Sequence, residues 1–134
     1  MAKPEQQLQV SICDYLKLQY PHAIFFSEPS GLRVSMGQAK LLKRMRSFGK
    51  LPDLFIAFPN GKYHGMFIEL KTNDSNPFLK DGSLSKSEHI QGQLNTLKTL
   101  HSLGYAAVFG VGFDDTKNKI DKYFSLEKIN PEEK

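Results

Sequence analysis

The stretch LPDLFIAFPNGKYHGMFIELKT, residues 51 to 72, constrains the fold more than any other part of the chain. Two apolar runs flank a polar segment that contains Asn60-Gly61, a pair that strongly favours a turn between antiparallel strands. Short apolar runs bounded by turn residues are typical of buried strands. We therefore predict two adjacent strands, with Asp53 at the start of the first and Glu69 and Lys71 at the end of the second.

Helical periodicity and strand-like apolar runs alternate along the rest of the chain. The patterns predict helices over about 4–20, 34–49, 87–103 and 116–124, and further strands over 23–27 and 105–112. A polar loop over 73–88 separates the second predicted hairpin strand from the third helix. Since 134 residues suit one core, we predict a single domain over 1–134, with its core over about 4–124 and a polar tail over 125–134. The fold class is α/β, a mixed central sheet flanked by helices.

Local signals suggest where the later helices begin. Ser35 with Gln38, and Ser85 with Glu88, have the spacing of a capping box, and Asp114 or Asp115 suits the N-cap of the last helix. The second helix carries a predicted apolar stripe at helical spacing, formed by Met36, Ala39, Leu42, Met45 and Phe48.

Glu5 is an unusual residue in the first predicted helix. It lies three residues before Leu8 and seven before Ile12, so it shares their inward stripe. One interpretation is an acidic group that faces a functional site. The other is a carboxylate that complements the helix dipole in the first turn.

Positive charge is concentrated in one part of the sequence. The formal net charge is +4, and the eighteen residues from 33 to 50 contain no Asp or Glu. This is compatible with a nucleic-acid partner, although a charged helix face is often only solvated. The candidate phosphate-binding residues are Arg33, Lys40, Lys43, Arg44, Arg46 and Lys50.

Other classes of protein are disfavoured. The single Cys13 cannot form an intramolecular disulfide, and no apolar run approaches the roughly 18 residues that cross a bilayer. The polar N-terminus does not resemble a secretory signal. We expect a chain of the reducing cytoplasm, with no membrane partner and no organic cofactor.

The central hairpin brings three charged residues together. Side chains alternate along a strand, so Glu69 and Lys71 share a face, and antiparallel pairing brings Asp53 beside them. Neighbouring carboxylates repel unless a cation lies between them. Mg²⁺ binds oxygen ligands and commonly needs only one or two protein carboxylates, whereas the ligand spacing of a zinc site is absent. Read singly, the same residues could be a surface ion pair and a turn.

The residues Pro52-Asp53 followed by Glu69-Leu70-Lys71 resemble the PD-(D/E)xK nuclease signature. The fuller pattern resembles the VRR-NUC domain, the virus-type replication-repair nuclease module, especially its small stand-alone phage and bacterial members. The similarity covers roughly residues 4 to 124, and GKYHGMFIELKT is its most specific part.

The resemblance implies roles for individual residues. Asp53 and Glu69 would bind the metal together with the carbonyl of Leu70, and Lys71 would be the catalytic lysine. Glu5 would approach the metal, directly or through water. Gln93 occupies the position of the helix glutamine of the family, where it would position Lys71 or the scissile phosphate; Gln91 lies on another helix face.

The resemblance also implies an activity and partners. The expected function is a Mg²⁺-dependent DNA endonuclease, with Mn²⁺ as a substitute, that acts on Holliday junctions, flaps or other branched DNA in replication, repair or recombination. A homodimer in the cytoplasm of a bacterium or a phage-infected cell is expected. The alternatives are a restriction-type or nonspecific nuclease, a non-catalytic DNA-binding module, and a domain whose charged residues are only structural.

Overall fold

The computed structural model describes residues 3–28 and 34–126 and confirms the predicted order of elements. Helix α1 spans Pro4–Gln19, α2 Met36–Arg44, α3 Glu88–Ser102 and α4 Gly112–Phe124. The strands are β1 (Ile24–Ser27), β2 (Leu54–Ala57), β3 (Met66–Lys71) and β4 (Ala106–Val111), and a short 3₁₀ helix, η1, spans Asn73–Ser75.

The four strands form one mixed sheet in the order β1-β2-β3-β4. β1 and β2 are antiparallel, as are β2 and β3, whereas β3 and β4 run parallel. In the β2–β3 hairpin, Asn60 and Tyr63 exchange backbone hydrogen bonds, and Gly61 adopts a positive φ of 57°. The predicted hairpin and the predicted mixed α/β sheet are therefore confirmed.

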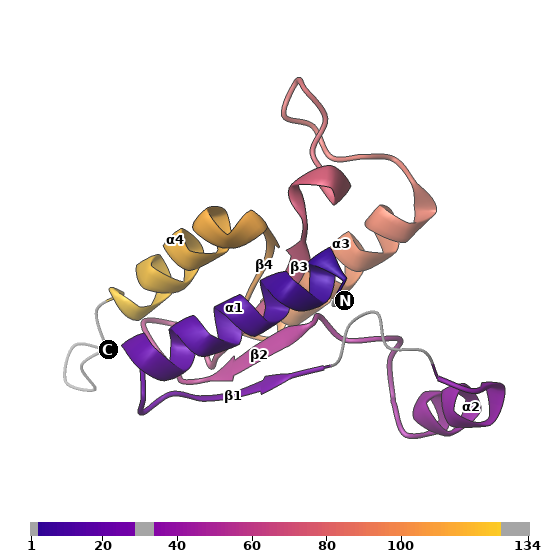
Figure 1. The fold of residues 1–134 in the computed structure, drawn as a ribbon, viewed down its shortest axis with the longest axis horizontal. Helices are drawn as coiled ribbons and strands as arrows, with labels where there is room; N and C mark the ends of the chain where they lie inside the picture. Colours follow the sequence, from indigo (N-terminus) through magenta and orange to yellow (C-terminus); the bar gives the residue numbers. More distant parts are fainter. Residues whose placement is uncertain (1–2, 29–33, 127–134) are drawn as a thin grey trace.

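Helices cover the two faces of the sheet (Figure 1). On one face, Ile12 and Leu16 of α1 and Ile120 of α4 are fully buried against Ile56 and Ile68 of the sheet. On the other face, α3 packs over β4, where Ile90 and Leu97 contact Phe109. The sheet is therefore fixed from both sides at β3, the strand that carries Glu69 and Lys71.

Helix α2 differs most from its predicted form. It ends at Arg44 rather than near Phe48, and none of its residues is buried. Met36 is 80% and Met45 72% exposed, so the predicted apolar stripe is not part of the buried core. Figure 1 shows the reason: α2 stands apart from the other helices.

The residues predicted to cap two of the helices are wrong, although the third helix begins close to its predicted start at residue 87. Ser87, not Ser85, is the N-cap of α3, because its hydroxyl accepts a hydrogen bond from the Ile90 amide at 3.2 Å. Helix α4 begins at Gly112, so Asp115 lies inside the first turn, where it accepts a hydrogen bond from the Val111 amide at 2.9 Å. The cap predicted at Ser35, with Gln38, is confirmed.

The polar segment between β3 and α3 is folded against the domain. Its backbone pairs Phe78 with Leu84, and the Phe78 ring meets Phe109 of β4 edge to face. The described helices include none that is long and apolar enough to cross a membrane.

Candidate active site

The hairpin register brings Asp53 to Glu69. β2 and β3 pair Leu54 with Ile68, so Asp53, one residue before β2, lies beside the next residue of β3. Both side chains are buried, with exposed fractions of 3% for Asp53 and 6% for Glu69. The backbone holds Asp53 in place, because its Oδ2 accepts a hydrogen bond from the Leu70 amide at 3.0 Å.

Alternation along β3 determines which side Glu69 faces. Met66 and Ile68 belong to the core cluster beneath α1 and α4. Glu69 points to the opposite face, where the Gln93 amide of α3 donates a hydrogen bond to its Oε1 at 2.9 Å. This hydrogen bond connects Gln93 to the predicted site through Glu69. Gln91, two residues earlier in α3, has a different partner, because its side-chain amide donates to the backbone carbonyl of Ser85 at 2.8 Å.

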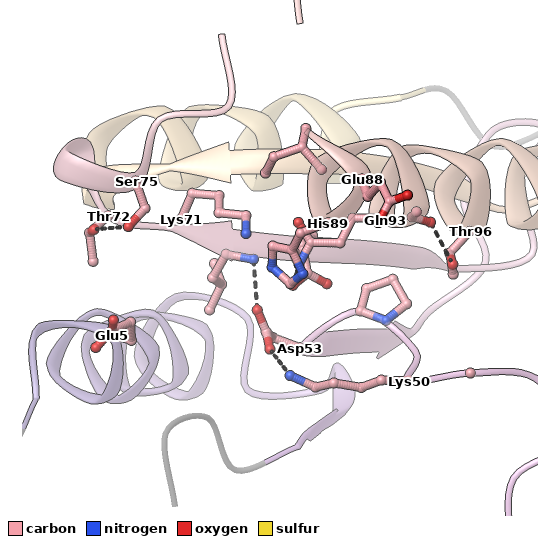
Figure 2. A pocket seen from close by; sticks show the side chains of 16 residues that line it. Glu5, Lys50, Asp53, Lys71, Thr72, Ser75, Glu88, His89, Gln93 and Thr96 are labelled. Carbon is pink, nitrogen blue, oxygen red and sulfur yellow. Dashed lines mark hydrogen bonds and ion pairs between the residues drawn. The ribbon is translucent and has the colours of Figure 1, made fainter. Parts of the chain in front are cut away.

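These residues line one cavity of about 670 Å³ (Figure 2). Asp53 and Lys71 direct their charged ends toward its middle, whereas Glu5 lies at its edge on α1. Glu5 is exposed, and the described residues include no group of three or more His, Cys, Asp or Glu that could hold a metal ion. The structure therefore brings Asp53, Glu69, Lys71 and Gln93 together and leaves Glu5 on the wall of the same cavity.

The electrostatics of the two carboxyls are unfavourable without a cation. Burial and, after it, the negative charge of the neighbouring Asp53 together raise the pKa of Glu69 to about 8, although the positive charges of Lys50 and Lys71 oppose the shift. Gln93 Oε1 is buried, and no described residue gives it a hydrogen bond.

The residues present fit a hard divalent cation. The donors are carboxylate and amide oxygens, which Mg²⁺ and Mn²⁺ accept, and Mg²⁺ needs only one or two protein carboxylates. A cation shared by Asp53 and Glu69 would relieve the repulsion that raises the pKa of Glu69.

The basic residues predicted to bind DNA have different surroundings. Lys40, Lys43 and Arg44 are exposed on α2. Arg46 forms an ion pair with Glu28 at the end of β1. Lys50 reaches into the main cavity, where its Nζ lies 3.1 Å from Asp53 Oδ1. Arg33 lies outside the described residues.

Sequence reasoning missed a buried polar residue of α1 and part of the cavity wall. Gln9 of α1, which is not among the residues that line the cavity, is buried and donates to the Ser27 hydroxyl and the Glu28 carbonyl. It lies four residues after Glu5 and on the helical stripe of Ile12, so its spacing could have identified a buried polar residue. The cavity wall also includes Thr72, Ser75, Glu88, His89 and Thr96. Of these, His89 lies one helical turn before Gln93, a spacing that could have placed it beside the site.

Comparison with solved structures finds a match over nearly the whole chain. A solved structure described as a "VRR_NUC domain protein" superposes with a TM-score of 0.67, covers 97% of this chain and 95% of that one, and is 23% identical in sequence. No protein-family model and no curated protein matches. At this identity the likeness shows a shared fold, so the resemblance to the VRR-NUC domain is confirmed at the level of the fold.

Proposed function

We propose that this chain is a metal-dependent endonuclease that hydrolyses phosphodiester bonds in DNA. The observation that supports this most directly is the meeting of Asp53, Glu69 and Lys71 in one cavity at the end of β3. The fold shared with a protein named for a VRR_NUC domain supports the same conclusion.

Asp53 and Glu69 would hold Mg²⁺ or Mn²⁺, together with the carbonyl of Leu70. When bound, such an ion supplies Lewis-acid polarisation of a phosphoryl oxygen and favours ionisation of water. Glu5 would contribute through water, which suits its position on the cavity wall rather than beside the two carboxyls.

Lys71 would act on the substrate directly, and Gln93 would orient one of the metal-binding carboxylates. Lys71 would orient the attacking water and offset the negative charge that develops on the phosphate in the transition state. Gln93 fixes the orientation of Glu69 through their 2.9 Å hydrogen bond. The other polar atom of the Gln93 side chain, Oε1, is buried and has no hydrogen-bond partner among the described residues. It can therefore accept a hydrogen bond from a water or a substrate group.

The exposed basic residues of α2 would bind the DNA backbone. Lys40, Lys43 and Arg44 offer contacts that position DNA without reading its sequence. We therefore propose structure-specific cutting of branched DNA, in the cytoplasm, with restriction-type or nonspecific cutting as the alternative.

A cleavage assay tests the activity. Labelled four-way junction, flap, duplex and single-stranded DNA are incubated with the protein, with Mg²⁺, with Mn²⁺ or with a chelator. We expect cleavage only with a metal ion and fastest on a branched substrate. Lys71→Ala should reduce the rate about 100-fold or more, because it removes the charge placed to stabilise the transition state.

Lys62→Ala is the matched control, because Lys62 lies in the turn at the other end of the same hairpin. It should leave cleavage unchanged. Cleavage that ignores both the chelator and Lys71→Ala would contradict the mechanism. If the protein binds DNA but does not cleave it in the presence of either metal ion, a non-catalytic DNA-binding module would be favoured.

We also propose that two copies act together, since two symmetric cuts in a branched substrate need two active sites. Light scattering on the purified protein should give twice the mass of one chain. A mass of one chain, with and without a four-way junction, would contradict the dimer.

A further inference from the structure

Lys50 is bound to one of the two carboxylates that would hold the metal. Its ammonium lies 3.1 Å from Asp53 Oδ1, while Asp53 Oδ2 accepts the Leu70 amide at 3.0 Å. Asp53 therefore has one fixed donor from the sheet and one donor from a long side chain. An ammonium and a divalent cation are both drawn to the same carboxylate oxygen, and they repel each other when close.

Lys50 is the partner that can move. Its side chain is 48% exposed, whereas that of Asp53 is 4% exposed. Lys50 lies between α2 and β2, outside any helix or strand, and no atom lies within 4 Å of the position that a Cβ on Gly49 would take. Asp53 cannot move with Lys50, because two hydrogen bonds hold it in place. The Leu70 amide donates to its side chain, and the Glu28 amide donates to its backbone carbonyl.

A second, basic cavity lies next to the first. It has a volume of about 480 Å³, and its lining includes Lys43, Arg46 and Ser47. Gly49 and Lys50 line both cavities, so Lys50 lies at the boundary between them. A DNA phosphate bound beside Lys43 would give the Lys50 ammonium an alternative anionic partner.

We propose that Lys50 occupies Asp53 in the free protein and transfers to a DNA phosphate in the complex, so that DNA and the divalent cation strengthen each other's binding. The inference depends on the proposed function, because it assigns a role to Lys50 in the same site. Since coupling between two ligands is reciprocal, DNA tightens metal binding by the same factor by which metal tightens DNA binding.

The first test measures metal binding to the free protein. Mn²⁺ is titrated into the wild type, Lys50→Met and Lys50→Arg, and the Kd is measured by calorimetry. Lys50→Met should bind Mn²⁺ about fivefold or more tightly than the wild type, because no ammonium competes for Asp53. Lys50→Arg keeps the competing charge and should bind like the wild type.

Lys98→Met is the matched control. Lys98 is exposed on α3 and does not line either cavity, so its removal changes the net charge equally without freeing Asp53. Its Mn²⁺ affinity should stay at the wild-type value. If Lys50→Met binds Mn²⁺ no more tightly than Lys98→Met, or more weakly than the wild type, the proposal is overturned.

The second test measures the coupling itself. In a Lys71→Ala background, which suppresses cleavage, a four-way junction should tighten Mn²⁺ binding about tenfold. The same junction should have a smaller effect when Lys50→Met is added. An equal effect in both proteins would overturn the proposed transfer.

The two ideas fail in different ways. If the wild type neither binds nor cuts any DNA, the proposed function fails. If it cuts DNA with a metal ion but Lys50→Met shows no gain in Mn²⁺ affinity, only the role of Lys50 fails.

Discussion

Glu69 is a buried acid whose folded environment favours the neutral form. Burial and the charge of Asp53 raise its pKa to about 8, against an ordinary value of 4.5. Between these values the folded protein holds more protons than the unfolded chain. The free energy of unfolding therefore falls as the pH rises through this window, and the stability present below pH 4.5 is lost above about pH 8.

The change Glu69→Gln should remove this pH dependence, because a neutral amide has no proton to lose. We expect the melting temperature of the variant, relative to the wild type, to rise between about pH 5 and about pH 8.5. Calorimetric melting with a chelator present measures this difference. If the melting temperatures of the two proteins change in parallel across this pH range, the pKa of Glu69 is not raised in the folded state.

The central residues of the site could be predicted from sequence because strand periodicity and hairpin register are local. Alternation placed Glu69 and Lys71 on one face, and the Asn60-Gly61 turn placed Asp53 beside them. The pairing of Lys50 with Asp53 could not be predicted, because it depends on the path of an irregular segment after α2.

At the scale of elements, close packing at the start of α4 fixes the edge of the sheet where the site lies. β4 runs parallel to β3 and pairs Leu70 with Gly110 and Lys71 with Val111. Thr116 of α4 is fully buried over Gly110, and its hydroxyl donates to the Gly112 carbonyl at 2.7 Å. Gly110 therefore allows α4 to approach β4, the strand that pairs with the end of β3 that carries Glu69 and Lys71.

Gly110→Ala should destabilise the protein by about 1–3 kcal/mol through overpacking. The added methyl would overlap the Thr116 hydroxyl and come within 3.0 Å of Ile68 Cγ2. Gly92→Ala is the contrast, because Gly92 lies inside α3 with no atom within 4 Å of the new Cβ. It should stabilise the protein by about 0.5–1 kcal/mol. Urea denaturation measures both changes, and a midpoint for Gly110→Ala at or above the wild-type value would contradict the packing argument.

Helix existence was more predictable than helix boundaries. The periodicity of α1 and α3 follows from side chains that pack on the core, such as Ile12 and Leu97. The stripe of α2 has the same spacing but lies off the sheet, because tertiary placement decides which apolar face is covered. The cap of α3 could be either of two nearby Ser residues, which the sequence alone does not distinguish. Helix α4 follows Val111, whose side chain forms no cap hydrogen bond, so its start carries no local capping signal.

At the scale of the whole molecule, α2 is a basic arm connected to the candidate site through Gly49 and Lys50, which line its cavity. Four described basic residues of α2 and of the segment just after it fall into two groups. Lys40, Lys43 and Arg44 are exposed, whereas Arg46 binds Glu28 and joins the segment after α2 to the end of β1. If DNA lies along this arm, the exposed group should account for the counterions released on binding, and Arg46 should serve chiefly to hold the arm in place.

Removing one positive charge from the exposed group should therefore affect DNA binding differently from removing the charge of Arg46. Lys43→Gln should weaken binding to duplex and junction alike and reduce the slope of log K against log salt by about one, because one phosphate contact is lost. Arg46→Gln should change the slope less, since its guanidinium is already paired with Glu28. Anisotropy of labelled DNA across a salt series, in the Lys71→Ala background, measures both. Lys62→Gln, in the turn far from the cavity, should leave the slope unchanged; an equal loss for Lys62→Gln and Lys43→Gln would show that α2 is not the DNA-binding surface.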